Sequence, residues 1–358
     1  MENQWNVIEF DKPNFDDISE LRDGFEAKEV KSNRRTYSPN YYDWKLRKNP
    51  FSNGTCKVIE SEGKPVGLAT VTPKQIFIRG RLIDGAEIGD TFTHPNFQRK
   101  GIFSAVVNGA RSASISKNIE FIFGTPNDQS LPGYQKKCEF ETIPAVRAMN
   151  MVLPLRIGPI LNTKLKNPFL ANLAALPLSW GLGAWTAVRA PKVKNKIQFV
   201  EAKSFPTEVD ELWRKVSQNY DWMIARTRQY LQWRFVENPD NYTIFLGTEG
   251  SAFKGYVVLK IGTWSNLRVG YIADFLIDES NPTNFTQLVK FVRNHFKQAG
   301  IDMISCWIPE GKHSGVLRQF GFRKYKDVPV ICYKNNLGKE LIESCDRWYF
   351  TISDSDNI

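Results

Sequence analysis

Residues 86–111 read AEIGDTFTHPNFQRKGIFSAVVNGAR, and this stretch decides how the chain around it is interpreted. The run 86–93 is typical of a strand, and the run 103–111 has apolar residues at helical spacing. Between them lies a basic turn that contains Gly101. A strand that enters a helix through such a turn presents backbone N–H groups and the positive end of the helix dipole to an anion. The stretch therefore predicts a phosphate-binding turn.

The chain repeats a rare aromatic pattern once. Residues 41–50 and residues 230–239 share the frame Tyr-x-x-Trp-Lys/Arg-x-x-x-Asn-Pro. Strand-like runs downstream recur in the same order, at 66–71, 88–90 and 119–122 in the first copy and at 254–259, 272–274 and 301–304 in the second. Each copy reads as a helix, hairpin strands, a long strand, a helix, a strand, a helix and a strand. The repeat indicates that one fold occurs twice.

The local pattern of the first copy is clear enough to place its elements. Residues 57–59 and 67–71 are predicted to be strands on either side of a turn at 62–64. The amphipathic run 103–117 predicts a helix, and residues 119–123 follow it as a buried strand.

The second copy lacks the basic turn. After Asp274 it reads FLIDESNPTN over residues 275–284, with no glycine, no basic residue and two carboxylates. Such a turn would repel a phosphate, so we assign phosphate binding to the first copy alone. The second copy is expected to be a degenerate repeat that packs against the first.

Composition narrows the classes of partner. The 358-residue chain carries a net charge of +10, which favours an anionic partner. It has no long basic tract and no zinc-finger spacing, so we expect no nucleic acid partner. Its five cysteines show no C-x-x-C pair, its N-terminus has no secretory pattern, and no two of its three histidines have metal-ligand spacing. We therefore expect a cytoplasmic setting and no metal.

Gln98, Gly101 and the position of Phe103 fit the frame Q/R-x-x-G-x-G/A. This frame resembles motif A of the GNAT (GCN5-related N-acetyltransferase) superfamily, although Phe103 stands where a small residue is usual. The resemblance implies an α/β fold of the α+β kind, with two GNAT-like domains in tandem, each a mixed, mostly antiparallel sheet flanked by helices. The expected parts are an acyl-CoA-binding domain at 1–148 (the first half), an apolar helical connector at 149–197, a degenerate GNAT-like domain at 198–335 (the second half) and a C-terminal tail at 336–358.

The resemblance also implies which residues contact acetyl-CoA, the acyl donor. They lie on the strand before the turn, in the turn itself, and in a second motif that resembles the family pattern N-x-x-A-x-x-x-Y. The expected contacts are Thr91, Phe92, Thr93, Gln98, Arg99, Lys100, Gly101, Ile102, Phe103, Ser104, Asn127 and Ser130. The ending of the second motif departs from the family, because Cys138 stands where glycine is usual and Phe140 comes one residue late.

Three residues are candidates for catalysis. The resemblance places Tyr134 near the sulfur as a general acid and Glu87 where many members carry a catalytic glutamate. Strand alternation puts Glu87 and Thr91 on one face and Asp90 on the other. The open alternatives are a core aromatic for Tyr134, a solvated strand end for Glu87, and a structural role for Asp90, which has a counterpart at Asp274.

Residues 167–188 are strongly apolar, with lysines on both sides and proline and glycine interruptions. They predict an interfacial helix or hairpin in peripheral contact with a membrane, a homodimer interface, or a plain connector. The last residues of the tail are polar and predicted to fray.

The favoured function is an N-acyltransferase that moves an acetyl group from acetyl-CoA to an amine on a small molecule or an amino sugar. One alternative is a catalytically inactive protein that binds CoA or another ligand. Another is a tandem GNAT-like aminoacyl transferase, although the phosphate-binding turn argues against it.

Overall fold

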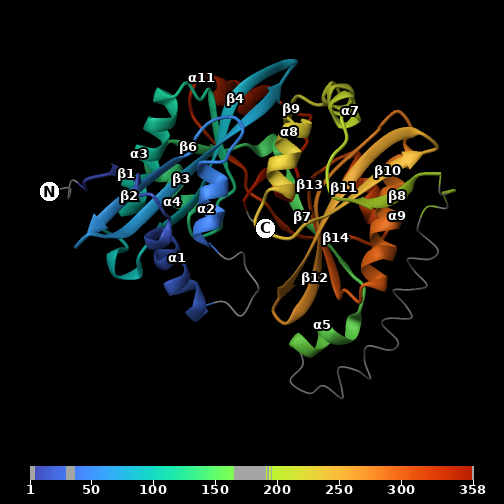
Figure 1. The fold of residues 1–358 in the computed structure, drawn as a ribbon, viewed down its shortest axis with the longest axis horizontal. Coiled ribbons are helices and arrows are strands. Elements are labelled where there is room, and N and C mark those ends of the chain that lie inside the picture. The colour runs from blue at the N-terminus through green and yellow to red at the C-terminus, as the bar shows by residue number, and fades with distance from the viewer. Residues whose placement is uncertain (1–4, 30–36, 165–190, 192, 195, 357–358) are drawn as a thin grey trace.

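The computed structural model of the chain describes residues 5–29, 37–164, 191, 193–194 and 196–356. Two mixed sheets lie side by side with helices around them (Figure 1). The expected fold class is confirmed.

The first sheet is built mainly by the first half of the chain. Its strands follow in the order β1 (Ile8–Glu9), β2 (Thr55–Ser61), β3 (Lys64–Ile78), β4 (Arg81–Thr93), β5 (Phe121–Gly124), β15 (Ile331–Tyr333) and β6 (Phe140–Thr142). β9 (Trp222–Ile224) also pairs with β3. The pairing is antiparallel except between β4 and β5, which run parallel.

The second sheet repeats this plan. Its order is β14 (Arg323–Asp327), β7 (Ala148–Pro154), β13 (Met303–Pro309), β12 (Leu267–Ile277), β11 (Ala252–Trp264), β10 (Thr243–Glu249) and β8 (Gln198–Ala202). Here β12 and β13 form the parallel pair.

The described helices of the first half are α1 (Asp16–Glu29), α2 (Pro39–Leu46), α3 (Ile102–Ser116) and α4 (Leu131–Lys137). The later ones are α5 (Ile157–Lys164), α7 (Glu208–Ser217), α8 (Arg228–Leu231), which continues as a π-helical turn at Gln232–Val236, α9 (Thr283–Gln298), α10 (Lys312–Gln319) and α11 (Asn336–Ser344). The strands and the helix expected around the turn at 62–64 and over 103–117 are confirmed by β2, β3 and α3.

The halves exchange strands, which the sequence did not indicate. β7 lies at the start of the expected connector but pairs in the second sheet. β15 and α11 come from the far end of the chain but lie against the first sheet, as the red α11 shows in Figure 1. Each sheet is therefore completed by chain from the other side of the expected boundary.

The repeated aromatic frame forms the junction between the halves. The indole rings of Trp44 and Trp233 stack with centroids 4.6 Å apart at 15°. Each indole N–H donates to the other residue's backbone carbonyl oxygen, at 2.9 Å from Trp44 and 3.2 Å from Trp233. Both residues are almost fully buried. The repeat thus makes a reciprocal contact related by an approximate two-fold axis.

Residues just before the frame and near its end shape the chain on either side of this contact. The hydroxyl groups of Ser38 and Thr227 cap α2 and α8 by accepting the backbone N–H three residues later, each at 3.2 Å. The amide oxygens of Asn49 and Asn238 accept the N–H two residues on, which turns the chain sharply before the next strand. Each copy of the frame, together with the three residues before it, therefore forms a capped short helix and a turn.

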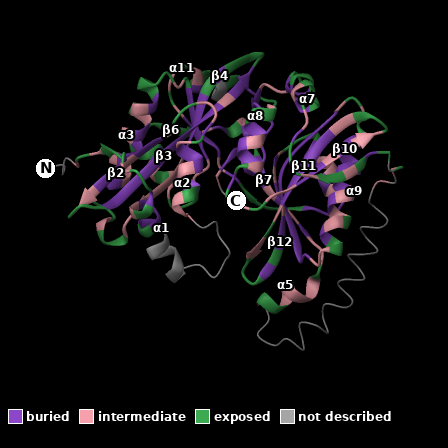
Figure 2. Cartoon of the chain, viewed as in Figure 1, coloured by how far each residue is buried: buried purple, intermediate pink, exposed green. Residues whose placement is uncertain are grey.

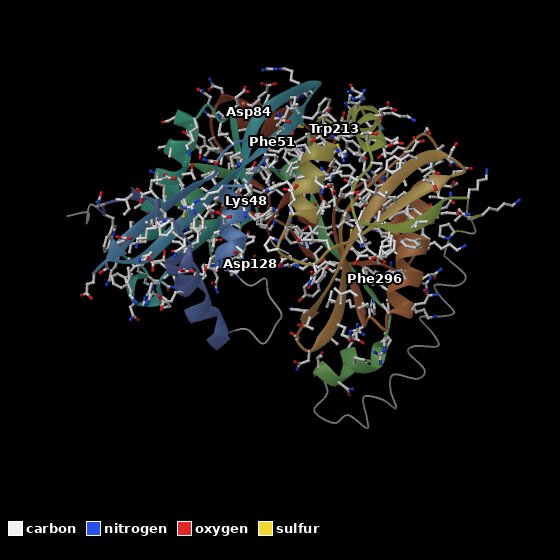
Figure 3. The ribbon with its side chains drawn as sticks, viewed as in Figure 1. Lys48, Phe51, Asp84, Asp128, Trp213 and Phe296 are labelled. Atoms are coloured by element: carbon white, nitrogen blue, oxygen red, sulfur yellow. The ribbon has the colours of Figure 1, made fainter. Side chains whose placement is uncertain are left out.

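Burial continues from the sheets through this junction (Figure 2). Aromatic side chains from both halves meet there, among them Phe51 and Trp213, labelled in Figure 3. Phe51 stacks on Tyr230 with centroids 6.2 Å apart, and the ring of Trp213 meets that of Phe77 edge-on at 6.3 Å. The halves therefore share one core.

The expectation of a frayed tail is wrong for the described residues. Thr351 to Ser355 are buried, and Asp356 is nearly so. We call Thr351–Asp356 the strap. Its polar side chains pair with buried charges in both halves, a condition that local composition could not reveal.

The apolar segment 167–188 lies outside the described residues. Among the helices of the described ranges, none is long and apolar enough to cross a membrane.

The reciprocal tryptophan pair predicts non-additive stability. Replacing Trp44 or Trp233 with alanine should each lower the free energy of unfolding by about 3–5 kcal/mol, because a large buried ring is lost. The double variant should lose at least about 1 kcal/mol less than the sum of the single losses, because both variants remove the same contact. Urea denaturation of the full chain measures all three. Trp264→Ala, at a ring that is 40% exposed, is the control with a small effect, and full additivity would contradict the pairing.

Candidate functional site

β4 and β5 part where the first half opens. Their parallel pairing runs only from Gly85 to Glu87 on β4. β5 comes very close at its end, because a Cβ on Gly124 would lie 2.9 Å from the carbonyl oxygen of Ile88. Beyond this point β4 stays paired with β3 as far as Thr93. We call the place where β4 and β5 stop pairing, beyond Glu87, the splay.

β4 carries a bulge in the splay. Asp90 has a left-handed φ of +46°, and the register with β3 shifts between Leu68 and Thr70. The hydroxyl of Thr70 supports the bulge by donating to the carbonyl oxygen of Gly89 at 3.1 Å. Bulges insert a residue and reverse the alternation of side chains beyond them.

The bulge corrects one prediction. The expectation that Glu87 and Thr91 share a face, opposite Asp90, is wrong. Thr91 instead lies on the face of α3 and α4, where its hydroxyl oxygen is 2.6 Å from that of Tyr134. Glu87 and Asp90 both face lysines on the other side. Simple alternation failed because it assumed an uninterrupted strand.

Tyr134 reaches the splay from α4. Its side chain is 4% exposed, and burial raises the pKa of its phenol well above the ordinary value, although the hydrogen bond with Thr91 opposes this. The phenol therefore keeps its proton at neutral pH. Tyr134 is a core aromatic whose hydroxyl is directed at β4, so the two interpretations of this residue are compatible.

The structure explains Phe103, which stands where a small residue is usual. Its ring meets Tyr134 edge-on with centroids 5.1 Å apart. It also lies over Gly133, where an added Cβ would come within 2.7 Å of the ring. The glycine on α4 therefore makes room for the large residue on α3, and the contact ties the start of α3 to Tyr134.

The basic turn ends at the N-terminus of α3. Arg99 and Gly101 have left-handed φ values of +63° and +82°, and a Cβ on Gly101 would meet nothing within 4 Å. No side chain caps the helix, and residues 98–101 are exposed. Successive N–H groups in such a turn form a concave anion site on the helix dipole.

The remaining expected donor-side residues have defined places. Ile102 is buried beneath the turn, and Ser104 donates back to the carbonyl oxygen of Gly101 at 2.9 Å. Asn127 turns the chain into α4, since its side-chain oxygen accepts the N–H of Ser130 at 2.9 Å. Its predicted contact with the acyl donor, like those of the other donor-side positions, stays a prediction.

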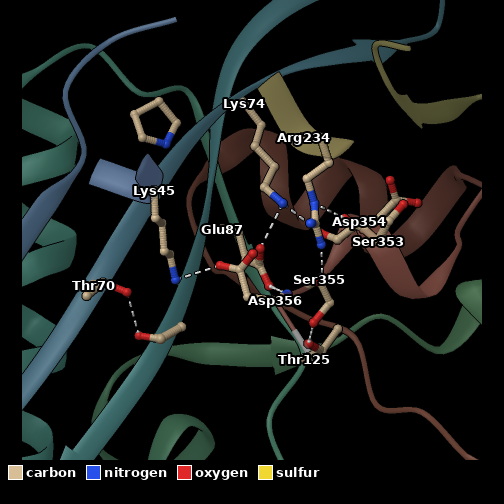
Figure 4. A network of polar contacts seen from close by, with 12 residues as sticks. Lys45, Thr70, Lys74, Glu87, Thr125, Arg234, Ser353, Asp354, Ser355 and Asp356 are labelled. Carbon is tan, nitrogen blue, oxygen red and sulfur yellow. Dashed lines mark hydrogen bonds and ion pairs between the residues drawn. The ribbon is translucent and has the colours of Figure 1, made fainter. Parts of the chain in front are cut away.

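The opposite side of the splay holds buried charges (Figure 4). The ammonium of Lys45 lies 2.6 Å from a carboxylate oxygen of Asp356. It also lies 2.7 Å from a carboxylate oxygen of Asp90. Lys74 lies 2.8 Å from Glu87. Burial alone would lower the pKa of Lys45, yet the carboxylates of Asp356 and Asp90 raise it above its ordinary value, so Lys45 stays charged.

Glu87 is tied to the strap as well as to Lys74. It is 2% exposed, and its second oxygen accepts the backbone N–H of Asp356 at 3.1 Å. Burial and the nearby Asp356 raise the pKa of Glu87, while Lys74 acts in the opposite direction. With both oxygens engaged, Glu87 is placed to hold the strap.

Sequence reasoning missed Lys45, Lys74 and Asp356. The available signal was the basic residue in the repeated frame, Lys45 in one copy and Arg234 in the other. The polar tail gave no comparable signal, because its partners are far away in the sequence.

The corresponding opening in the second half is filled by the chain itself. Pairing of β12 with β13 ends at Ile272. Beyond it, Asp274 is fully buried against Arg226 at 3.0 Å and accepts the hydroxyl of Tyr256 at 2.7 Å. Tyr349 donates its hydroxyl to the carbonyl oxygen of Phe275. Ile272–Ile277 of β12 are therefore buried.

The turn after β12 is acidic, as expected. Burial opposes ionisation of Asp278, but hydrogen bonds from Lys215 and Ser280 lower its pKa to about 2. Lys215 and Lys254 are therefore occupied by this carboxylate, at 2.8 and 3.5 Å. The described residues contain no group of three or more His, Cys, Asp or Glu side chains arranged to hold a metal ion.

Comparison with known proteins agrees with this geometry. Residues 18–142 match the acetyltransferase (GNAT) domain family. No curated protein matches the whole sequence significantly.

Solved structures share the fold at low identity. A tandem GNAT protein from the clavulanic acid biosynthesis pathway has a TM-score of 0.60 and 15% identity, over 92% of this chain and 98% of that one. A GCN5-related N-acetyltransferase from Anabaena variabilis has a TM-score of 0.63 and 12% identity, over 92% and 72%. The N-myristoyltransferase of Saccharomyces cerevisiae with bound myristoyl-CoA has a TM-score of 0.63 and 12% identity, over 100% and 85%. Residues 18–142 therefore match the acetyltransferase (GNAT) domain family, and the chain as a whole has a tandem GNAT-like fold.

Proposed function

We propose that the first half is an N-acyltransferase that moves an acetyl group from acetyl-CoA to an amine acceptor. The observation that carries this proposal is that the basic turn and the Tyr134 hydroxyl are linked by direct contacts. The left-handed turn at Arg99–Gly101 opens the helix whose Phe103 packs on Tyr134, and the Tyr134 hydroxyl meets β4 in the splay. A phosphate site and a proton-bearing phenol are thereby held on one side of one strand.

The donor side supplies binding. The N–H groups around Gly101 suit the pyrophosphate, and the exposed Arg99 and Lys100 add positive charge. The resemblance to GNAT members assigns the backbone of residues 91–93 to the pantetheine and thioester. Because the halves differ at this turn, the second half has no part in donor binding.

The proposed reaction is direct transfer. The amine nitrogen attacks the thioester carbonyl carbon, and the C–S bond then breaks to give an amide and the CoA thiolate. An acceptor that arrives as an ammonium gives one proton to a nearby base before it attacks, and its nitrogen loses a second proton as the amide forms. The Tyr134 hydroxyl gives its proton to the thiolate. The products are the N-acetyl acceptor and free CoA thiol, and protons balance because one of the two protons lost by the amine returns to Tyr134 through solvent and the other is released.

We assign the base role to Asp90 in preference to Glu87. The Asp90 side chain is 5% exposed, against 2% for Glu87, and Asp90 precedes Thr91, which contacts Tyr134. Glu87 has both oxygens engaged, one by Lys74 and one by the backbone N–H of Asp356. Asp90 is therefore nearer along β4 than Glu87 to the residue that contacts the proposed acid.

The charges support a cationic acceptor. Glu87, Asp90 and Asp356 place three carboxyl groups beside the ammonium groups of Lys45 and Lys74. An amine that arrives as an ammonium would be favoured there over a neutral alcohol. The acceptor we propose is an amine of a small molecule or an amino sugar.

Stabilisation by acyl-CoA and release of CoA thiol distinguish this function from two alternatives. A longer acyl chain is one, because the yeast structure binds myristoyl-CoA. A binding protein without transfer activity is the other. The cytoplasmic setting remains a proposal, which is supported by five cysteines that are all buried and unpaired.

Gly101→Glu should abolish stabilisation by acetyl-CoA, because a carboxylate at the turn would repel phosphate. At a ligand concentration of 100 Kd, wild type should gain about 2.7 kcal/mol, measured as a rise in Tm in a thermal-shift assay. Gly80→Glu is a matched control, since Gly80 has a φ of +84° and the same open surroundings in the distant β3–β4 turn. Running myristoyl-CoA in parallel identifies the preferred chain length, and equal stabilisation of both variants would contradict the assigned turn.

Tyr134→Phe should lower kcat by about 100-fold while leaving the Kd for acetyl-CoA unchanged, because it removes only the acid. Release of free CoA thiol across an amine panel measures this. Since burial raises the pKa of Tyr134, its acid form is retained as pH rises through 10, and the wild-type rate should not fall there through this group. Tyr325→Phe, at an exposed tyrosine, is the control. An unchanged kcat in Tyr134→Phe would contradict the acid role of Tyr134. If wild type releases no thiol with any amine, the result favours a binding protein.

A further inference from the structure

The strap is held by the second half and ends in the site of the first half. Its Asp354 carboxylate accepts two hydrogen bonds from Arg226, each at 2.8 Å. The same arginine donates to Asp274 at 3.0 and 3.2 Å. All three side chains are completely buried. Removal of one partner from such a cluster leaves an uncompensated charge, so its geometry is strongly fixed.

Further hydrogen bonds fix the backbone path of the strap. Thr351 donates its hydroxyl to Asp274 at 2.8 Å, and its backbone N–H donates to Asp354 at 2.8 Å. Arg234 donates to the backbone carbonyl oxygens of Ser353 and Ser355 at 3.2 and 3.4 Å. The second half therefore determines where residue 356 lies.

The other end of the strap meets the first half (Figure 4). The carbonyl oxygen of Asp354 accepts Lys74 at 2.9 Å, and the hydroxyl oxygens of Ser355 and Thr125 are 2.5 Å apart. Asp356 then pairs with Lys45, which also pairs with Asp90. The strap thus touches α2, β3, β4 and the end of β5.

These contacts reach the bulge of β4. Asp90 is the residue with the left-handed φ, and Thr91 next to it bonds Tyr134. A left-handed conformation in a residue other than glycine is costly and persists only where its surroundings hold it. The Lys45 ammonium, fixed from behind by Asp356, is positioned to supply that support.

We propose that the second half serves the first by holding the strap, so that Arg226 acts through Asp354, Asp356 and Lys45 to fix the β4 bulge and the Thr91–Tyr134 pair. Arg226 and Asp356 are then positioning residues for acyl transfer. The proposal deepens the proposed function, on which its kinetic readout rests, and assigns a task to a half whose own opening is filled.

Hydrogen exchange of the full chain, followed by mass spectrometry, tests the structural part. Asp356→Asn weakens the pair with Lys45, and Arg226→Lys keeps the charge but loses the forked contact with two carboxylates. Both should raise amide exchange of residues 90–93 about five-fold or more. The combined variant should add little, because both changes act through one strap.

Asp327→Asn is the matched control. It makes the same change in an exposed pair, in which Asp327 lies 2.6 Å from Lys324 on β14, and it should leave exchange at 90–93 unchanged. Faster exchange confined to the strap and the second half would overturn the proposal. If Arg226→Lys does not fold, Asp356→Asn at the less buried end decides the question alone.

Kinetics supply the second readout. Asp356→Asn and Arg226→Lys should lower kcat about ten-fold or more while changing the Kd for acetyl-CoA less than about two-fold, since the donor-binding turn is untouched. Unchanged kcat in both variants would overturn the positioning role. If wild type neither binds nor uses an acyl-CoA, the proposed function fails, while the exchange result still decides whether the second half fixes the bulge.

Discussion

The stacked and reciprocally bonded pair of Trp44 and Trp233 is the contact on which the rest of the structure depends. Each indole N–H needs an acceptor when it is buried, and each finds one on the opposite copy of the same sequence frame. The pair therefore satisfies itself only when both copies are folded and face each other. It also sets the position of Lys45 and Arg234, the next residues along, so the interface and the charged side of the site are fixed together.

The two copies differ in what surrounds the end of their parallel strand pair. Each has a parallel strand pair that parts after a few residues, and each places an aspartate just beyond the point of parting. In the first copy Asp90 faces Lys45, and residues 89–93 of β4 are half-buried. In the second copy Asp274 faces Arg226 and aromatic side chains close the opening. The same backbone plan thus leaves a half-buried strand segment in one copy and a packed core in the other.

Much of the fold could be predicted because its signals are local. The glycine-bearing turn, the hairpin around residues 62–64 and the helix after Gly101 depend on residues close in sequence, and all three are present. Alternation along β4 was misleading, because a bulge is fixed by contacts with β3 and Lys45 and leaves no mark in the strand itself. The strap was also misinterpreted because its partners are distant in the sequence. Polar residues predict exposure, but here arginine and lysine side chains from other elements pair with them and allow their burial.

The buried charges of the strap also bear on why a tail of this composition is ordered. Burying Asp354 alone would be unfavourable by several kcal/mol, so the strap can occupy the junction only where Arg226 has already been placed by the second half. The order of dependence therefore runs from the second half to the strap and then to the first half. A repeat that has lost its phosphate turn can still be required under this arrangement, because its buried arginine fixes a carboxylate that the other repeat uses.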